Sequence, residues 1–209
     1  MINKKDEFYT LKNDNSIRIP VGACRFTAMA FSITNYKEAQ KKLEDIRYNY
    51  PDATHHVCAF RVFQGEELLE KSSDDREPAG SAGKPVMEVL RRNQLVNTQI
   101  IVVRYFGGVK LGIGGLIRAY RLSAKEVVKT VNFLPLREVK YLTATVPYQL
   151  LGEVLKLIYS LNGEIIETKY DQNATVIFLL DKEHLSQFKD AFQNCTRGQG
   201  TFTIGGVNV

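Results

Sequence analysis

Residues 104–128 read RYFGGVKLGIGGLIRAYRLSAKEVV, and this stretch decides the fold of the first part of the chain. The residues just before the glycines, NTQIIVVRYF (97–106), form a nearly continuous apolar run, which is typical of a central strand buried on both faces. Beyond the glycines, the pattern from about Gly115 to Val131 has the periodicity of a helix. The predicted order is therefore strand, glycine-rich loop, helix.

The residues upstream of this segment predict further strands and helices. Residues 24–34 alternate apolar and polar side chains and predict a strand, residues 35–50 have helical periodicity, and residues 53–63 are a second β-rich run. Residues 66–85, EELLEKSSDDREPAGSAGKP, are dense in turn-forming Ser, Asp, Pro and Gly. They predict a long polar loop that leads into a short helix over residues 85–95, with Pro85 in its first turn.

The last third of the chain starts a new pattern after a proline. Residues 141–206 predict a strand, a helix, two strands, a helix and a strand, and this βαββαβ order is that of the ferredoxin-like arrangement. The boundary is expected near residues 133–137, where Pro135 interrupts the pattern. We therefore predict an α+β protein with an N-terminal domain over residues 1–135 and a ferredoxin-like domain over residues 136–209.

Charge is distributed unevenly between these two parts. The chain has 28 Lys and Arg against 23 Asp and Glu, a net charge of +5, whereas the residues from Arg137 onward have 7 cations and 8 anions. The positive excess therefore belongs to the N-terminal part. Between Lys84 and Lys129 lie nine cations and only two carboxylates, Glu88 and Glu126. Such a basic field attracts polyanions, nucleic acid above all.

Composition excludes several other classes of protein. A hydrophobic content of 44% in 209 residues is ordinary for a globular protein with a real core. The first residues contain no apolar stretch of signal-peptide length, and no run approaches the roughly 20 apolar residues of a membrane helix, so we expect a cytoplasmic protein without a membrane partner. Cys24, Cys58 and Cys195 are scattered without CxxC spacing, which favours reduced thiols over disulfides or zinc.

The glycine-rich loop lacks the spacing of known nucleotide-binding motifs. The GxGxxG pattern fails at Ile117, and the P-loop pattern fails because Gly112 is followed by Ile113. What remains is a site in which backbone amides and cations bind an anion or nucleic acid. The alternative is that the glycines only make tight turns and close packing. The candidate binding residues are Lys84, Arg104, Gly107, Gly108, Lys110, Gly112, Gly114, Gly115 and Arg118.

Three carboxylates, three aromatic residues and two histidines complete the candidates. Asp74, Asp75 and Glu77 could hold Mg²⁺ or act as general acid and base, but we favour ion pairs that brace the acidic and glycine loops against each other. His55 and His56 have no partner in the sequence to complete a metal site. We therefore expect no metal, no cofactor and no catalytic residue. The aromatic residues next to cations could stack on bases or belong to the core, and they are Tyr105, Phe106 and Tyr120.

Two motifs resemble the signatures of the IMPACT family. SDDREPAGSAGKP (73–85) is similar to the family pattern S-D-D-G-E-P-x-G-T-A-G-K-P, and VVRYFGGVKLGIGGLIRAY (102–120) is similar to R-Y-F-G-G-x-K-L-G-x-G-G-L-x-R-A-Y. The resemblance spans roughly residues 20–130, and the two-part layout is that of the bacterial, YigZ-like branch. The sequence departs from the family pattern at three positions, with Cys24 in place of Ser, Arg76 in place of Gly and Ser81 in place of Thr.

The resemblance carries expectations about fold and function. It implies an N-terminal fold like the second domain of a small-subunit ribosomal protein, and a C-terminal domain similar to the last domain of a translocating elongation factor. It also implies a translation-associated regulator, because eukaryotic relatives control translation. Our main hypothesis is a non-catalytic protein that binds RNA, the ribosome or an acidic translation partner through the basic glycine-rich loop. Two alternatives stay open, a small-molecule or nucleotide-handling enzyme and a protein-binding regulator without nucleic acid.

Overall fold

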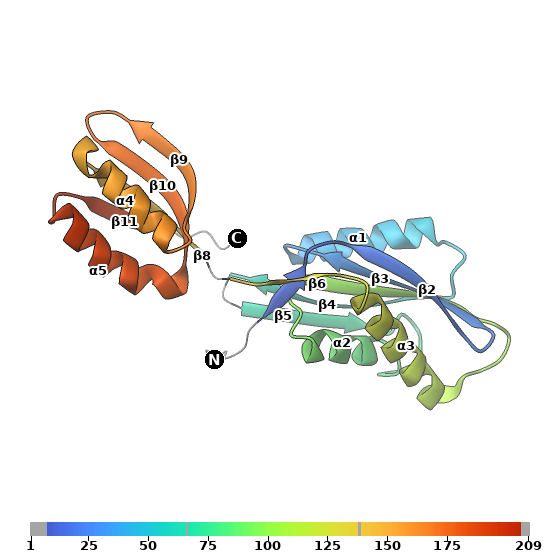
Figure 1. The fold of residues 1–209 in the computed structure, drawn as a ribbon. Helices are drawn as coiled ribbons and strands as arrows, with labels where there is room; N and C mark the ends of the chain where they lie inside the picture. Colours follow the sequence, from blue (N-terminus) through green and yellow to red (C-terminus); the bar gives the residue numbers. More distant parts are fainter. Residues whose placement is uncertain (1–7, 66, 138, 206–209) are drawn as a thin grey trace. The chain divides into compact units, whose positions relative to one another are not determined.

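A computed structural model of the chain describes residues 8–65, 67–137 and 139–205 (Figure 1). The predicted acidic loop started at Glu66, which lies outside the described residues. The chain divides into two compact units, with the division between Leu136 and Arg137. Each unit mixes strands and helices around antiparallel sheets, so the protein has the α+β character that the sequence predicts.

A five-stranded antiparallel sheet forms the middle of the first unit. Its strand order is β2-β3-β6-β4-β5, and β6 (Thr98–Tyr105) is the central strand that the apolar run predicts. Seven of its eight residues are buried, because helices cover both faces of the sheet. The other strands are β2 (Asn15–Val21), β3 (Cys24–Ser32), β4 (His55–Gln64) and β5 (Glu67–Ser73).

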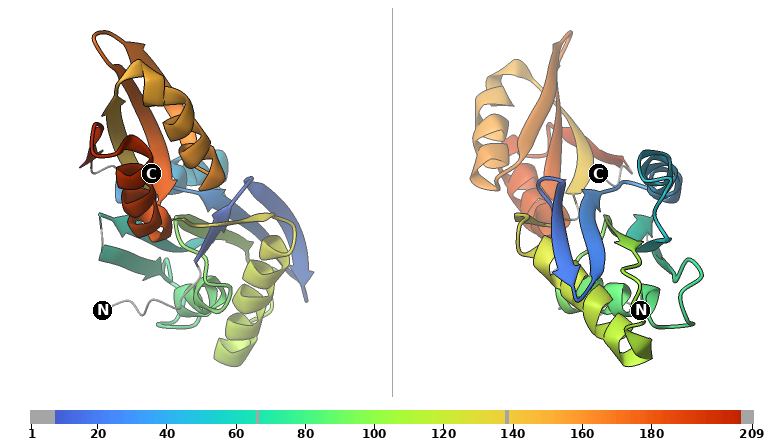
Figure 2. Two further views of the ribbon diagram at one scale, coloured as in Figure 1. Left: turned by 60° about the vertical axis from the view of Figure 1, so that its left-hand side comes forward. Right: turned by 90° about the vertical axis from the view of Figure 1, so that its right-hand side faces the viewer.

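Helices lie on the two faces of this sheet (Figures 1 and 2). Helix α1 (Tyr36–Asn49) packs on one face through Ala39 and Ile46. On the other face, α2 (Gly83–Arg92) and α3 (Gly112–Val128) form the main core with β3, β4 and β6. Asn35 caps α1, since its side chain accepts a hydrogen bond from the amide of Glu38.

The prediction of a loop over residues 66–85 is wrong in its first half. Residues 67–73 form β5, which pairs with β4 in antiparallel register from Gln64↔Glu67 to Cys58↔Ser73. Its polar sequence hides it from a search for apolar alternation. An edge strand has a neighbour on one side only, so it tolerates such polar side chains once β4 supplies the backbone hydrogen bonds.

The segment just before the division between the units contains a further strand. Residues Phe133–Pro135 form β7, which pairs with β1 (Tyr9–Leu11) in a small antiparallel sheet. Pro135 fits there because a proline at the end of an edge strand interrupts no ladder. The segment of the expected boundary therefore belongs to the first unit up to Leu136.

The second unit has the predicted βαββαβ order. Its sheet has the strand order β11-β8-β10-β9, with all neighbours antiparallel. The core lies between this sheet and α4 and α5, and is built around residues such as Phe178 and Phe188. The elements are β8 (Val139–Val146), α4 (Tyr148–Ser160), β9 (Glu164–Tyr170), β10 (Ala174–Asp181), the 3-10 helix η1 (Lys182–His184), α5 (Leu185–Thr196) and β11 (Thr201–Gly205).

None of the helices in the described part of the chain is long and apolar enough to cross a membrane.

Candidate anion-binding site

The glycine-rich loop connects the end of β6 to the start of α3 and packs against a turn from another strand pair. A β-carbon on Gly107 would lie 2.0 Å from the carbonyl oxygen of Ala23, in the turn between β2 and β3. Only glycine allows this contact. Gly108 and Gly112 have φ angles of +84° and +68°, which glycine adopts without strain. These three glycines therefore serve the turn and the packing, as the structural alternative expects.

Gly114 and Gly115 have a different setting, in the first turn of α3. The residue that precedes the helix, Leu111, makes no side-chain hydrogen bond that caps it. The first amides of a helix have no partner within the helix and carry a partial positive charge. A β-carbon on Gly114 would lie 3.5 Å from Nη1 of Arg118, so this guanidinium lies back along the first turn. Uncapped amides and a cation thus lie together at the start of α3.

Among the described residues, no carboxylate neutralises the exposed cations of the predicted set. Lys84, Lys110 and Arg118 are exposed, and within the described ranges none of them has a carboxylate in ion-pair distance. Lys110 lies in the loop just before α3, and Lys84 lies in the first turn of α2. These side chains can accept an anion without first breaking an ion pair.

Arg104 is placed differently, because it is buried. Its side chain has only 5% of its surface exposed, and Nη1 donates to Oε1 of Glu77 at 2.7 Å. Tyr120, from α3, donates its hydroxyl to the same oxygen at 2.6 Å. Nη2 of Arg104 donates to Sγ of Cys24 at 3.4 Å. Arg104 therefore joins β6, the acidic loop, α3 and β3 beneath the glycine loop and does not face solvent.

The burial of the cluster of Arg104, Glu77 and Tyr120 affects the protonation of Tyr120. Burial, followed by the hydrogen bond and the negative charge of Glu77, raises the pKa of the Tyr120 hydroxyl far above its ordinary value. Tyr120 therefore stays a neutral donor to the carboxylate. Nε2 of His55 lies 3.6 Å from the same Oε1 atom of Glu77.

Asp74 and Asp75 hold the acidic loop in shape. The Asp74 carboxylate accepts hydrogen bonds from the amides of Gly80, Ala82 and Gly83, at 2.8 to 3.0 Å. It thereby binds the start of α2, where orphan amides favour a carboxylate. Asp75 accepts from the amide of His56 at 2.6 Å and pairs with Arg47 of α1 at 3.2 Å.

The two histidines are engaged within the fold. Nδ1 of His55 lies 2.8 Å from the backbone oxygen of Asp75, and Nε2 of His56 lies 2.9 Å from the backbone oxygen of Tyr50. Because a carbonyl only accepts, each of these ring nitrogens carries a hydrogen. On the same strand, burial raises the pKa of the Cys58 thiol to about 11. The thiol that shares a sheet face with His56 is thus a poor metal ligand at neutral pH.

The sequence left the exposure of the aromatic candidates undecided and did not indicate that two apolar loop residues are exposed. Of the aromatic candidates, Tyr120 is fully buried, whereas Phe106 is 46% exposed. Val109 and Ile113, which had not been considered, are 66% and 61% exposed. The sequence does contain a signal for Val109 and Ile113, because apolar residues beside loop glycines are not needed in a loop that only connects two elements.

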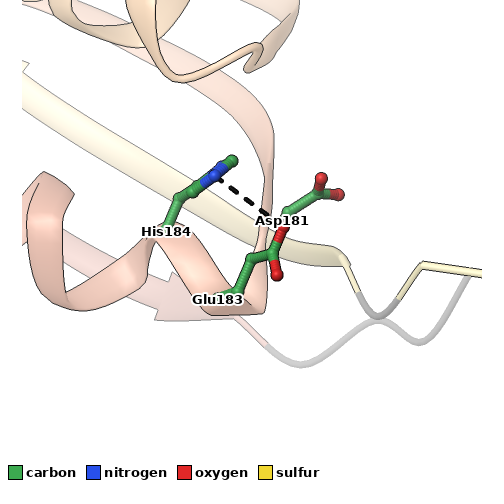
Figure 3. A group of neighbouring side chains, drawn as sticks. All are labelled: Asp181, Glu183 and His184. Atoms are coloured by element: carbon green, nitrogen blue, oxygen red, sulfur yellow. Dashed lines mark ion pairs between the residues drawn. The ribbon is translucent and has the colours of Figure 1, made fainter. Parts of the chain in front are cut away.

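A further group of possible metal ligands lies in the second unit (Figure 3). One ligand atom each from Asp181, Glu183 and His184 lies within 4.8 Å of the others. The three residues come from the end of β10 and from η1, so they are neighbours in sequence as well. Asp181 pairs with Arg137 at 3.5 Å, and Glu183 lies 3.8 Å from His184. The Asp181 carboxylate is thus paired with a guanidinium, and the Glu183 side chain is 78% exposed to water.

Comparison with known proteins covers both units. Residues 23–128 match the Impact N-terminal domain family, and residues 145–199 match a domain of unknown function, DUF1949. The chain is 28% identical over 198 residues to "IMPACT family member YvyE" of Bacillus subtilis, which covers 95% of this chain and 91% of that protein. It is 36% identical over 134 residues to "IMPACT family member in pol 5'region" of Thermus thermophilus, covering 64% of this chain and 71% of that one.

A solved structure supports the fold. The crystal structure of a hypothetical protein with 24% sequence identity aligns with a TM-score of 0.66 and covers 97% of this chain and 98% of that chain. The matched Impact domain contains both loops described above, from the acidic residues at 74–77 to the glycines at 107–115. The chain therefore belongs to the IMPACT family.

Proposed function

We propose that this protein is a non-catalytic, translation-associated regulator that binds RNA, alone or within the ribosome, through the basic glycine-rich loop. One observation carries the proposal: the uncapped first turn of α3 bears the guanidinium of Arg118 next to Gly114. Phosphate groups favour such a combination of helix amides and a cation. Lys110, one residue before the helix cap, extends the positive surface.

The charge of the neighbourhood favours a polyanion over a single small anion. Between Arg104 and Lys125 the sequence has five cations and no carboxylate. Arg121 is neutralised by Glu88 at 2.7 Å and Arg104 by Glu77. Lys125 lies in the last turn of α3, so Lys110 and Arg118 are the exposed cations at the glycine loop and the first turn of the helix. A chain of phosphates can contact such a field at several points, and each contact releases condensed counterions.

The bonds of the carboxylates favour a structural role for the acidic loop over an enzymatic one. Asp74 accepts hydrogen bonds from three amides. Asp75 accepts one from an amide and pairs with Arg47. Glu77 accepts from Arg104 and Tyr120. A catalytic carboxylate must reach a substrate, whereas these oxygens hold the loop against α2 and β6. In this proposal, Asp74, Asp75 and Glu77 shape the frame on which the glycine loop is displayed.

The proposed role in translation rests on family and fold analogy. The chain is 31% identical over 85 residues to "Protein IMPACT" of Danio rerio, and eukaryotic relatives of this kind are translation regulators. We also propose that the first unit shares the fold of a small-subunit ribosomal protein domain. The strand order β11-β8-β10-β9 with βαββαβ connections supports a ferredoxin-like second unit, similar to the last domain of a translocating elongation factor. A cytoplasmic location follows from this role.

The test is binding of a fluorescently labelled RNA hairpin with an unpaired loop, measured by anisotropy. The double variant Lys110→Gln/Arg118→Gln should bind at least about tenfold more weakly, since each charged contact contributes on the order of 1 kcal/mol. The control Lys41→Gln/Lys125→Gln removes two exposed cations outside the loop and the first turn of α3, and should bind like the wild type. Equal binding by all three proteins would refute the proposal.

The enzyme alternative makes a separate prediction. If the acidic and glycine loops handled nucleotides, purified protein with Mg²⁺ would hydrolyse ATP or GTP, and Asp75→Asn would abolish the turnover. Our account expects no turnover above background in either protein.

A further inference from the structure

Three exposed apolar side chains lie in one eight-residue segment of the glycine loop. The binding of phosphate does not explain their exposure. Phe106, Val109 and Ile113 are 46%, 66% and 61% exposed, and they alternate with the glycines and with Lys110 in the sequence. Phosphate contacts alone need cations and amides. We propose that this surface selects single-stranded RNA, with an unpaired base stacked on Phe106 while the phosphates lie on Lys110, Arg118 and the first turn of α3. This inference rests on the proposed function and names its ligand more narrowly.

The Phe106 ring is held from one side. The guanidinium carbon of Arg104 lies over the ring at 5.5 Å from its centroid, and Arg104 itself is fixed by Glu77 and Cys24. The amide of Phe106 donates to the hydroxyl of Thr54 at 3.1 Å. The backbone and one side of the ring are thus fixed, and the exposed part of the ring is free to contact a ligand.

Phe106 is one of the three aromatic residues that sequence alone left between core packing and base stacking. Its neighbour Tyr105 is less exposed; Arg25 lies over its ring at 5.3 Å, and its hydroxyl bonds to Asp52 at 2.9 Å. Phe106 has no hydroxyl that water or a carboxylate could bind, and Arg104 lies over only one side of its ring. Exposing it to water is unfavourable, so a ligand that covers it is stabilised by the burial.

Stacking distinguishes single strands from duplexes. In a duplex the bases are already stacked and paired, so the ring would find only sugar and phosphate edges. An unpaired base offers an apolar face, and stacking on an aromatic side chain contributes about 1–3 kcal/mol per base. An aromatic ring next to cations, with no carboxylate in the loop, is the combination that single-strand binding surfaces share. Val109 and Ile113 can contact riboses or a neighbouring base in the same way.

The experiment compares an unstructured 12-nucleotide RNA with its duplex, using wild-type protein and variants of Phe106. Wild type should prefer the single strand. Phe106→Leu keeps an apolar side chain but removes the ring, and should weaken single-strand binding by about fivefold or more, the equivalent of the lower stacking value. Binding to the duplex should be unchanged. Phe106→Tyr should retain the affinity, and Tyr159→Leu, which removes a ring that is 63% exposed on α4, should have no effect. Circular dichroism melting confirms that each variant is folded.

The outcomes separate this inference from the proposed function. If wild type binds both RNAs equally, or if Phe106→Leu binds the single strand like wild type, the inference is wrong although RNA binding stands. If wild type binds neither RNA but binds vesicles that contain phosphatidylserine, the exposed apolar and basic side chains serve a membrane surface. In that case both the inference and the proposed function fail.

Discussion

Arg104 and Glu77 form a buried ion pair, with Nη1 of the guanidinium 2.7 Å from Oε1 of the carboxylate. The pair joins the central strand of the first unit to the acidic loop, and Tyr120 adds a hydrogen bond from α3 to the same oxygen. The acidic and glycine loops, which lie about 30 residues apart in the sequence, are therefore one structural unit. A substitution in either loop should therefore alter the structure and stability of the other.

Removal of Glu77 should destabilise the protein strongly, because Arg104 would be left buried without its counter-charge. For Glu77→Ala we expect a loss of about 3–5 kcal/mol in the free energy of unfolding. The pair of Arg121 and Glu88 has the same 2.7 Å distance but is about one-third exposed, so Glu88→Ala should lose less than about 1 kcal/mol. Urea denaturation of the two variants side by side measures the difference. Similar losses would mean that burial of the first pair has no special effect.

Two glycines of the loop should respond to alanine in opposite directions. Gly107→Ala places a methyl group 2.0 Å from the Ala23 carbonyl oxygen and should cost about 3 kcal/mol or more. Gly114→Ala meets only the tip of Arg118 at 3.5 Å, and should stabilise α3 by about 0.5–1 kcal/mol. Thermal melting distinguishes the two. A stable Gly107→Ala protein would contradict the close packing of the loop on the β2–β3 turn.

Arg76 stands where the family pattern has glycine, and its φ angle is +72°. An arginine thus adopts here the conformation that glycine favours. Arg76→Gly should therefore raise the free energy of unfolding by about 0.5–1 kcal/mol, since relief of the strain exceeds the entropy that glycine adds to the unfolded chain. The opposing contact is one hydrogen bond of 3.4 Å from Arg76 to the Thr54 carbonyl. A measured loss of stability would show that this contact outweighs the strain.

Acid should weaken the first unit partly through Glu70. Hydrogen bonding to Arg91, and then to Arg61, holds the pKa of this carboxyl below its ordinary value against the opposing effect of burial. A carboxyl with a lowered folded-state pKa stabilises the fold above its unfolded pKa, near 4.5, and this contribution is lost as the pH falls through the folded value. Between pH 6 and pH 3, Glu70→Gln should lose less stability than wild type. Parallel curves for the two proteins would exclude this source of acid sensitivity.

Sequence patterns predicted the helices and strands with strong periodicity and missed those that form only through contacts with another segment of the chain. The apolar run of β6 and the periodic α1, α4 and α5 were predicted because local side chains alone determine them. Strand β5 was missed because its polar residues form a strand only through pairing with β4. The basic character of the glycine loop was evident from sequence. The burial of Arg104 was not, because its partner Glu77 comes from a segment whose position only the fold determines.

The measurement that tests the central claim most directly is the salt dependence of RNA affinity. If Lys110 and Arg118 contact phosphates, each contact contributes about −0.7 to the slope of log affinity against log salt for a single strand. Lys110→Gln and Arg118→Gln should each flatten the slope by about that amount, equally for RNAs of unrelated sequence. Lys125→Gln, at an exposed cation in the last turn of α3, should leave it unchanged. If neither loop variant changes affinity at any salt concentration, the glycine loop does not bind nucleic acid.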